Sequence, residues 1–131
     1  MLFFGMRTLL LAIILVSASA ICALSGTSGN ISTSSAQKMA KGKNILILDV
    51  RTPEEYVKGH LINAQLMNYY DNTFSAQLKT LPKSKTVIIY CKSGRRSAET
   101  LAMMKKLGFN NVYNMLGGFD AWSKENRRSA R

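Results

Sequence analysis

TVIIYCKSGRRS, residues 86–97, predicts a buried strand, a glycine-containing loop and the start of a helix. The first five residues are rich in β-branched side chains and carry no charge, which is typical of a strand covered on both faces. After the loop, apolar residues at 98, 101, 102, 104 and 107 follow helical spacing, and Gly108 ends that helix. This strand, loop and helix are the repeating unit of an α/β fold.

Further strands and helices alternate on both sides of this stretch. We expect strands at 44–50, 64–67 and 111–115, and helices at 34–41, from Thr52 onward, at 74–81 and at 119–125. The helix at Thr52-Pro53-Glu54-Glu55 has an N-cap, a proline in the first turn and a capping-box glutamate. The alternation predicts an α/β domain with a mostly parallel sheet and helices on both faces.

The composition limits the classes of protein that remain. The chain has 131 residues, with 18 Lys and Arg against 7 Asp and Glu, and a formal net charge of +11. That length suits one domain, and two cysteines are too few for a disulfide scaffold. The basic residues are scattered and are not interleaved with aromatic residues, so we expect no nucleic-acid partner. Apolar residues concentrate near the N-terminus, which excludes a protein with several membrane spans.

The N-terminal segment predicts export. Arg7 precedes an unbroken apolar run at 9–16, and Ala18-Ser19-Ala20 resembles a signal-peptidase site. We therefore expect a signal peptide at 1–20 and a periplasmic or other extracytoplasmic location. An uncleaved membrane anchor is one alternative. A lipid on Cys22 is another, although Ile21 is larger than the residue that usually precedes a lipidated cysteine.

The remaining segments divide by composition. Residues 21–30 are expected to be a Ser/Gly-rich tether, and this composition continues to Ser35. Residues 31–125 form the expected domain, and 126–131 a basic C-terminal tail.

Cys91 is the candidate nucleophile. It follows a buried strand, where ligands bind in open α/β sheets, and the loop after it can aim backbone N–H groups inward as an anion nest. Those groups and the helix N-terminus should lower the pKa of the thiol. Lys92, Arg95 and Arg96 add positive charge, and no acidic residue lies at 72–98. A low-pKa cysteine in such a loop is suited to attack anionic substrates, and the alternative is an inert buried cysteine.

Residues from about Ile31 to Lys124 resemble a single rhodanese domain, of the sulfurtransferase family. The matching stretches are Leu48-Asp49-Val50-Arg51, Glu55-Tyr56, Gly59-His60, CKSGRRS at 91–97, Asn111-Val112-Tyr113-Asn114, Gly117-Gly118 and Ala121-Trp122. The resemblance implies a five-stranded α/β fold and a persulfide on Cys91. One departure is Ile62-Asn63-Ala64, where the family often has Pro-Gly-Ala. Because asparagine tolerates left-handed backbone, we expect that turn to survive.

The loop length selects a reaction class by the same resemblance. Arg96 lies five positions after Cys91, whereas related cell-cycle phosphatases have a loop one residue longer. The shorter loop implies sulfane sulfur rather than phosphate. We expect a double displacement that moves sulfur from thiosulfate or a similar small anionic donor to cyanide or a thiol. Lys92, Ser93, Gly94, Arg95 and Arg96 are the expected donor-binding residues, although Arg96 has a structural role as its alternative.

Other residues are expected to support this site. Asp49 and Arg51 could pair and brace the loop together with Ser97, or be plain surface ions. His60, the only histidine, is expected to be structural, and Trp122 to be core. We expect no metal, no cofactor and a monomer. The alternative function is a non-catalytic rhodanese module for partner binding or redox sensing, in one form with Cys91 paired to Cys22.

Overall fold

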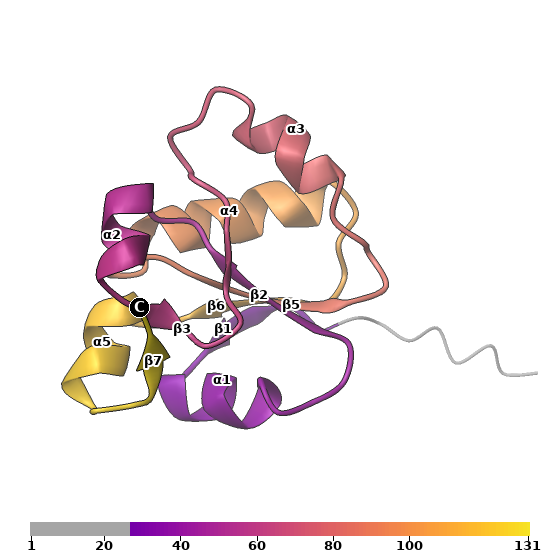
Figure 1. Ribbon diagram of the computed structural model, residues 1–131. Helices are drawn as coiled ribbons and strands as arrows, with labels where there is room; N and C mark the ends of the chain where they lie inside the picture. The colour runs from indigo at the N-terminus through magenta and orange to yellow at the C-terminus, as the bar shows by residue number, and fades with distance from the viewer. Residues whose placement is uncertain (1–26) are drawn as a thin grey trace, which may run out of the picture.

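Figure 1 shows the computed structural model of the chain, which describes residues 27–131. The predicted signal peptide and Cys22 therefore lie outside the described residues. The elements are β1 (Gly29–Ile31), α1 (Thr33–Met39), β2 (Ile45–Asp49), α2 (Pro53–Lys58), β3 (His60–Leu61), β4 (Gln65–Leu66), α3 (Phe74–Lys79), β5 (Thr86–Tyr90), α4 (Arg95–Lys106), β6 (Val112–Met115), α5 (Gly118–Lys124) and β7 (Ser129–Ala130). Within 27–131, no helix has the length and hydrophobicity needed to cross a membrane.

The main sheet has five strands in the order β1-β6-β5-β2-β4, and every pairing in it is parallel. Its centre is the pair of β2 and β5, which align from Ile45 with Thr86 to Asp49 with Tyr90. The predicted α/β class and five strands are confirmed, and the sheet is wholly parallel. Because all five strands run the same way, their carboxyl ends meet at one edge, and Cys91 follows the central strand there.

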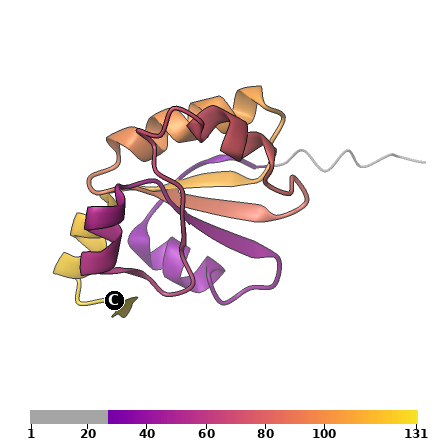
Figure 2. The same cartoon turned by 45° about the horizontal axis from the view of Figure 1, so that its top comes forward.

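Helices cover both faces of this sheet, as expected. In Figures 1 and 2, α3 and α4 lie on one face, and α1 lies on the other with α5 beside it. The side chains of β5 divide between two apolar cores, Val87 and Ile89 on one side and Ile88 and Tyr90 on the other. This alternation is the period of two that a strand imposes. Full burial of such side chains stabilises the fold by roughly 1.5–3 kcal/mol each.

Local sequence patterns predicted several elements at or near their observed bounds. The Thr52 hydroxyl accepts from the Glu55 amide, and the Glu55 carboxylate accepts from the Thr52 amide, so the capping box is present. The strand at 86–90 has the predicted bounds. Asn63 has a φ of 65°, so the turn survives on left-handed backbone. The helix expected at 74–81 ends at Lys79, two residues early.

The predicted tether is wrong for its last residues. Gly29–Ile31 forms β1, which pairs with β6 at the edge of the sheet. An edge strand is held by backbone hydrogen bonds and needs little apolar surface, which composition does not reveal. The side-chain amide Nδ2 of Asn114 also donates to Asn30 Oδ1 at 3.1 Å. Ser32, inside the same polar stretch, is the N-cap of α1.

The predicted basic tail is also wrong in part. Ser129–Ala130 forms β7, which pairs antiparallel with β3. The Trp122 indole N–H donates to the Arg128 carbonyl at 3.0 Å, which holds this segment against α5. The C-terminal residues therefore close one side of the domain.

Candidate active site

Cys91 lies at the centre of a ring of hydrogen-bond donors. The Gly94 amide donates to its Sγ at 3.0 Å, and the Ser97 hydroxyl at 3.3 Å. Gly94 has a φ of 116°, a backbone that glycine adopts without strain, and it caps α4. Cys91 is 1% exposed, so the donors act where water is nearly absent. One inward-facing backbone N–H group is thus present at Gly94, and the Ser97 hydroxyl adds a second donor to the sulfur.

These donors change the pKa of the Cys91 thiol. Burial by itself would raise that pKa, because a thiolate loses its hydration. Hydrogen bonds from the Ser97 hydroxyl and from the backbone at Ser97, Gly94 and Ser93 outweigh burial, and the pKa lies below its ordinary value. The direction agrees with the expectation from sequence. A thiolate in this position is a nucleophile.

The N-terminus of α5 holds the first residues of the loop. The Phe119 amide donates to the Cys91 carbonyl at 2.8 Å, and the Asp120 amide to the Lys92 carbonyl at 3.0 Å. Gly118 permits this approach, since a Cβ on it would lie 2.4 Å from the Cys91 carbonyl oxygen. The loop is thus fixed from the carbonyl side, which leaves its N–H groups free to face the sulfur.

The exposed cations of the loop are paired with acids. Lys92 Nζ lies 2.8 Å from Asp120, and Arg95 Nη1 lies 3.3 Å from Glu99. Arg95 Nη2 also donates to the Tyr70 hydroxyl at 3.2 Å. The absence of acidic residues at 72–98 suggests that nothing nearby opposes the positive charge of the loop. That interpretation is wrong, because Glu99 of α4 and Asp120 of α5 supply the acids.

Arg96 pairs with α2. Its guanidinium donates to both carboxylate oxygens of Glu55, at 2.8 and 3.0 Å, and its side chain is 10% exposed. These hydrogen bonds from Arg96 lower the pKa of Glu55 to about 2. The alternative that gave Arg96 a structural role agrees with this geometry, because the side chain ties the start of α4 to the first turn of α2.

Asp49 and Arg51 form a buried ion pair beside the loop. Arg51 Nη2 lies 2.7 Å from Asp49 Oδ2 and donates to the Gly59 carbonyl at 2.6 Å. The Tyr90 hydroxyl donates to the same carboxylate at 2.5 Å. The Arg51 guanidinium lies 4.2 Å from the centre of the Phe119 ring. The expected pairing is present, and it supports the residues before Cys91 and the helix docked on the loop.

Two further expectations concern residues outside the loop. His60 Nδ1 lies 2.9 Å from the Tyr56 carbonyl and its ring stacks on Tyr56, which agrees with the structural role. Trp122 is 5% exposed and belongs to the core, as expected. Within the described part of the chain, no group of three His, Cys, Asp or Glu side chains could hold a metal ion.

A small cavity of about 230 Å³ lies beside the loop. Its lining consists of Arg51, Glu55, Lys58, Lys92, Phe119 and Asp120. Sequence reasoning did not identify Glu55, Asp120, Tyr90 or Gly118 as site residues. Gly117-Gly118 was the one available signal for the last of these, since paired glycines often allow a close backbone approach.

Comparisons with known proteins agree with this architecture. A family model described as "Rhodanese-like domain" matches residues 32–125. The chain is 39% identical over 84 residues to "Probable adenylyltransferase/sulfurtransferase MoeZ" of Mycobacterium tuberculosis, covering 64% of this chain and 21% of that protein. It thus spans about a fifth of the length of that relative.

A second relative is closer to this chain in length. "Thiosulfate sulfurtransferase GlpE" of Coxiella burnetii is 31% identical over 98 residues, covering 70% of this chain and 84% of that protein. Among solved structures, a rhodanese-related protein from Thermoplasma volcanium superposes with a TM-score of 0.70 at 25% identity. That match covers 77% of this chain and 96% of the other.

Proposed function

The chain belongs to the rhodanese-like domain family, and from that premise we propose that it is a monomeric sulfurtransferase acting through a Cys91 persulfide. It moves sulfane sulfur from thiosulfate or a similar small anion to cyanide or a thiol. The observation that carries the proposal is the buried Cys91 Sγ. It accepts hydrogen bonds from the Gly94 amide and the Ser97 hydroxyl, and the pKa of the thiol lies below its ordinary value. A relative named as a thiosulfate sulfurtransferase supports the choice of donor.

In the first step, the Cys91 thiolate attacks the outer sulfur of thiosulfate. A bond forms between Sγ and that sulfur, the sulfur–sulfur bond of thiosulfate breaks, and sulfite leaves with the electron pair. The anionic persulfide that remains keeps its charge near the loop. Preorganised N–H donors stabilise this charge without rearrangement, which lowers the barrier.

In the second step, an acceptor removes the outer sulfur. Cyanide or a thiolate attacks it, the bond to Sγ breaks, and the Cys91 thiolate leaves with the electron pair. Cyanide becomes thiocyanate, and a thiol becomes a persulfide. The Ser97 hydroxyl and Gly94 amide that lower the thiol pKa also make this thiolate a good leaving group.

The loop cations act at the rim of the site rather than on the sulfur. Lys92 and Arg95 have side chains that are 61% and 62% exposed. Each keeps N–H groups beyond those given to Asp120, Glu99 and Tyr70. We assign them the orientation of the anionic end of the donor, while backbone amides bind the reacting sulfur.

The test measures mass and turnover together. The purified full chain is treated with thiosulfate and weighed intact, and thiocyanate is measured after cyanide is added. We expect a gain of one sulfur atom that cyanide removes, and neither result in Cys91→Ser. Wild-type protein that gains no sulfur and forms no thiocyanate would instead favour the non-catalytic module, and a Cys91–Cys22 disulfide would show in the same intact mass.

We also propose that residues 1–20 direct export to the periplasm or another extracytoplasmic compartment. The basis is the sequence pattern around Arg7 and Ala20. N-terminal mass analysis of the mature protein separates the outcomes. A start at Ile21 supports cleavage, a lipid on Cys22 or an intact leader supports a membrane tether, and an intact chain in the cytoplasm contradicts export.

A further inference from the structure

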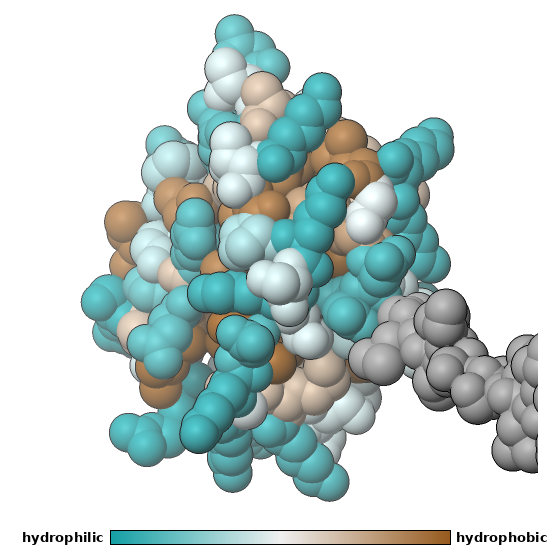
Figure 3. Space-filling model, turned by 90° about the vertical axis from the view of Figure 1, so that its right-hand side faces the viewer, coloured by the Kyte–Doolittle hydropathy of each residue, from teal (hydrophilic) through white to brown (hydrophobic). Residues whose placement is uncertain are grey.

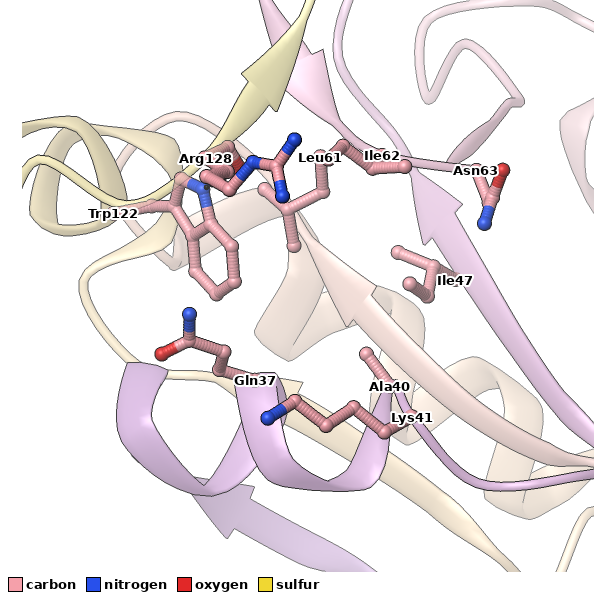
Figure 4. A pocket seen from close by; sticks show the side chains of 9 residues that line it. All are labelled: Gln37, Ala40, Lys41, Ile47, Leu61, Ile62, Asn63, Trp122 and Arg128. Carbon is pink, nitrogen blue, oxygen red and sulfur yellow. Dashed lines mark hydrogen bonds between the residues drawn. The ribbon is translucent and has the colours of Figure 1, made fainter.

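A second cavity lies away from the Cys91 loop, between α1, the end of β3 and the C-terminal segment (Figure 4). Its volume is about 190 Å³. Its walls are Gln37 of α1, Ala40 and Lys41 just after α1, Ile47 of β2, Leu61 of β3, Ile62 and Asn63 after β3, Trp122 of α5, and Arg128. No residue of the loop at 91–97 contributes to it, so this cleft is a separate feature of the molecule.

The floor of the cleft is apolar. Ile47, Leu61 and Trp122 are buried residues of one core cluster, and part of each faces the cavity. Figure 4 shows the indole of Trp122 forming one side, opposite Gln37 and Ala40. An apolar floor of this kind favours an apolar ligand group over water.

The rim of the cleft is cationic. Lys41 and Arg128 line it, and no Asp or Glu does. Among the ion pairs of residues 27–131, neither of these cations takes part. The loop cations, by contrast, all have carboxylate partners. Figure 4 also places the Gln37 amide in this rim, where its N–H groups face the cleft.

We propose that this cleft binds a small amphipathic carboxylate. Its apolar body packs on Trp122 and Leu61, and its carboxylate lies at the rim near Lys41 and Arg128. The charge of the rim selects an anion, and the volume selects a short chain, because cavities for drug-sized ligands measure roughly 300–1,000 Å³. The proposal does not depend on sulfur transfer.

Trp122 makes the binding directly measurable, because it is the only tryptophan of the chain. The full chain is titrated with butanoate, hexanoate and octanoate while tryptophan fluorescence is followed. We expect a saturable change, with affinity rising about fourfold per added methylene until the chain fills the cleft. Hexan-1-ol and hexylammonium, which lack the negative charge, should bind at least fivefold more weakly than hexanoate.

Matched variants test the rim. Lys41→Gln with Arg128→Gln should weaken hexanoate binding at least fivefold. Lys43→Gln with Arg131→Gln removes the same charge outside the lining and should leave binding unchanged, as should Cys91→Ser. Ala40→Phe should fill the cleft and abolish the fluorescence change.

Three results would overturn the proposal. They are no saturable change with any carboxylate, equal binding of hexan-1-ol and hexanoate, and equal loss in the rim and control variants. Binding is compared only among variants whose far-UV circular dichroism matches that of the wild type. If Ala40→Phe fails that criterion, the charge variants and the alcohol comparison still decide the outcome.

Discussion

The carboxyl end of β2 and the loop after β5 lie at the same edge of the sheet, and each holds a buried acidic group. Asp49 is 0% exposed and is bound by the Arg51 guanidinium and the Tyr90 hydroxyl. Cys91 is 1% exposed and accepts hydrogen bonds from one amide and one hydroxyl, both neutral donors. The first group is therefore held by a charged partner, and the second by uncharged donors.

The difference follows from what each group does. A guanidinium on both oxygens of a carboxylate gives strong, directional hydrogen bonds and no freedom. Amides and a hydroxyl stabilise negative charge on sulfur as it develops. The Asp49 pair therefore stabilises the fold, whereas the Cys91 ring is suited to chemistry. The following substitutions test this division.

The largest effect is expected for Arg51→Met. It removes the partner of a buried carboxylate, so the free energy of unfolding should fall by about 3–5 kcal/mol. Urea unfolding measures this change. Arg95→Met, which breaks an exposed pair, is the control and should cost less than about 1 kcal/mol. Equal losses in the two variants would contradict the stabilising role assigned to the buried pair.

Gly118→Ala should reduce sulfur transfer on the order of 100-fold. The added Cβ would lie 2.4 Å from the Cys91 carbonyl oxygen and 2.6 Å from that of Lys92, so α5 and the loop must separate. Displacement of a reacting group by about 1 Å has a cost of this size. Thiocyanate formation gives the measurement. Gly29→Ala, where a Cβ meets no atom within 4 Å, should keep its activity.

Ser97→Ala should move the pH dependence of persulfide formation. The Ser97 hydroxyl lowers the pKa of the Cys91 thiol, so its loss raises that pKa and a higher pH is needed to form the thiolate. We expect the midpoint of single-turnover rate against pH to rise by roughly one pH unit. Ser123→Ala, on the exposed face of α5, serves as the control. An unchanged midpoint would mean that backbone amides alone set the pKa.

The smallest effect on activity is expected for the exposed cations of the Cys91 loop. Glu99→Gln frees Arg95 from its exposed pair, so kcat/KM for thiosulfate should rise about threefold at low salt. The gain should shrink as salt screens the charge. Glu54→Gln removes an acid from α2 that forms none of the ion pairs of the loop cations. A comparable gain in that variant would show that only net charge matters.

Local sequence predicted the Cys91 loop because its determinants are contiguous. The β-branched strand, Gly94 and the helix after it are all encoded within residues 86–107. Two of the three carboxylate partners of its cations were not predictable in this way, whereas Glu99 lies only four positions after Arg95. Glu55 and Asp120 lie 41 and 28 positions from the residues they bind, and only the folded chain brings them together.

The two terminal strands, β1 and β7, were not predicted from sequence for a different physical reason. β1 and β7 are short and polar, and they are held by backbone hydrogen bonds whose partners belong to other strands. Such pairing leaves no periodic pattern of apolar side chains. Figure 3 shows one face of the molecule, on which hydrophilic side chains surround separate apolar patches.

The parallel course of β1 and β5 gives the domain a direction. Gly29 begins β1 at the amino edge of the sheet, whereas Cys91 follows β5 at the carboxyl edge. Figure 1 shows the chain entering β1 on the side away from α2 and α5. A segment joined before residue 27 is therefore attached at the edge of the sheet opposite Cys91. An anchor attached at that end would hold the domain by the amino edge of its sheet and leave the Cys91 loop at the opposite, carboxyl edge.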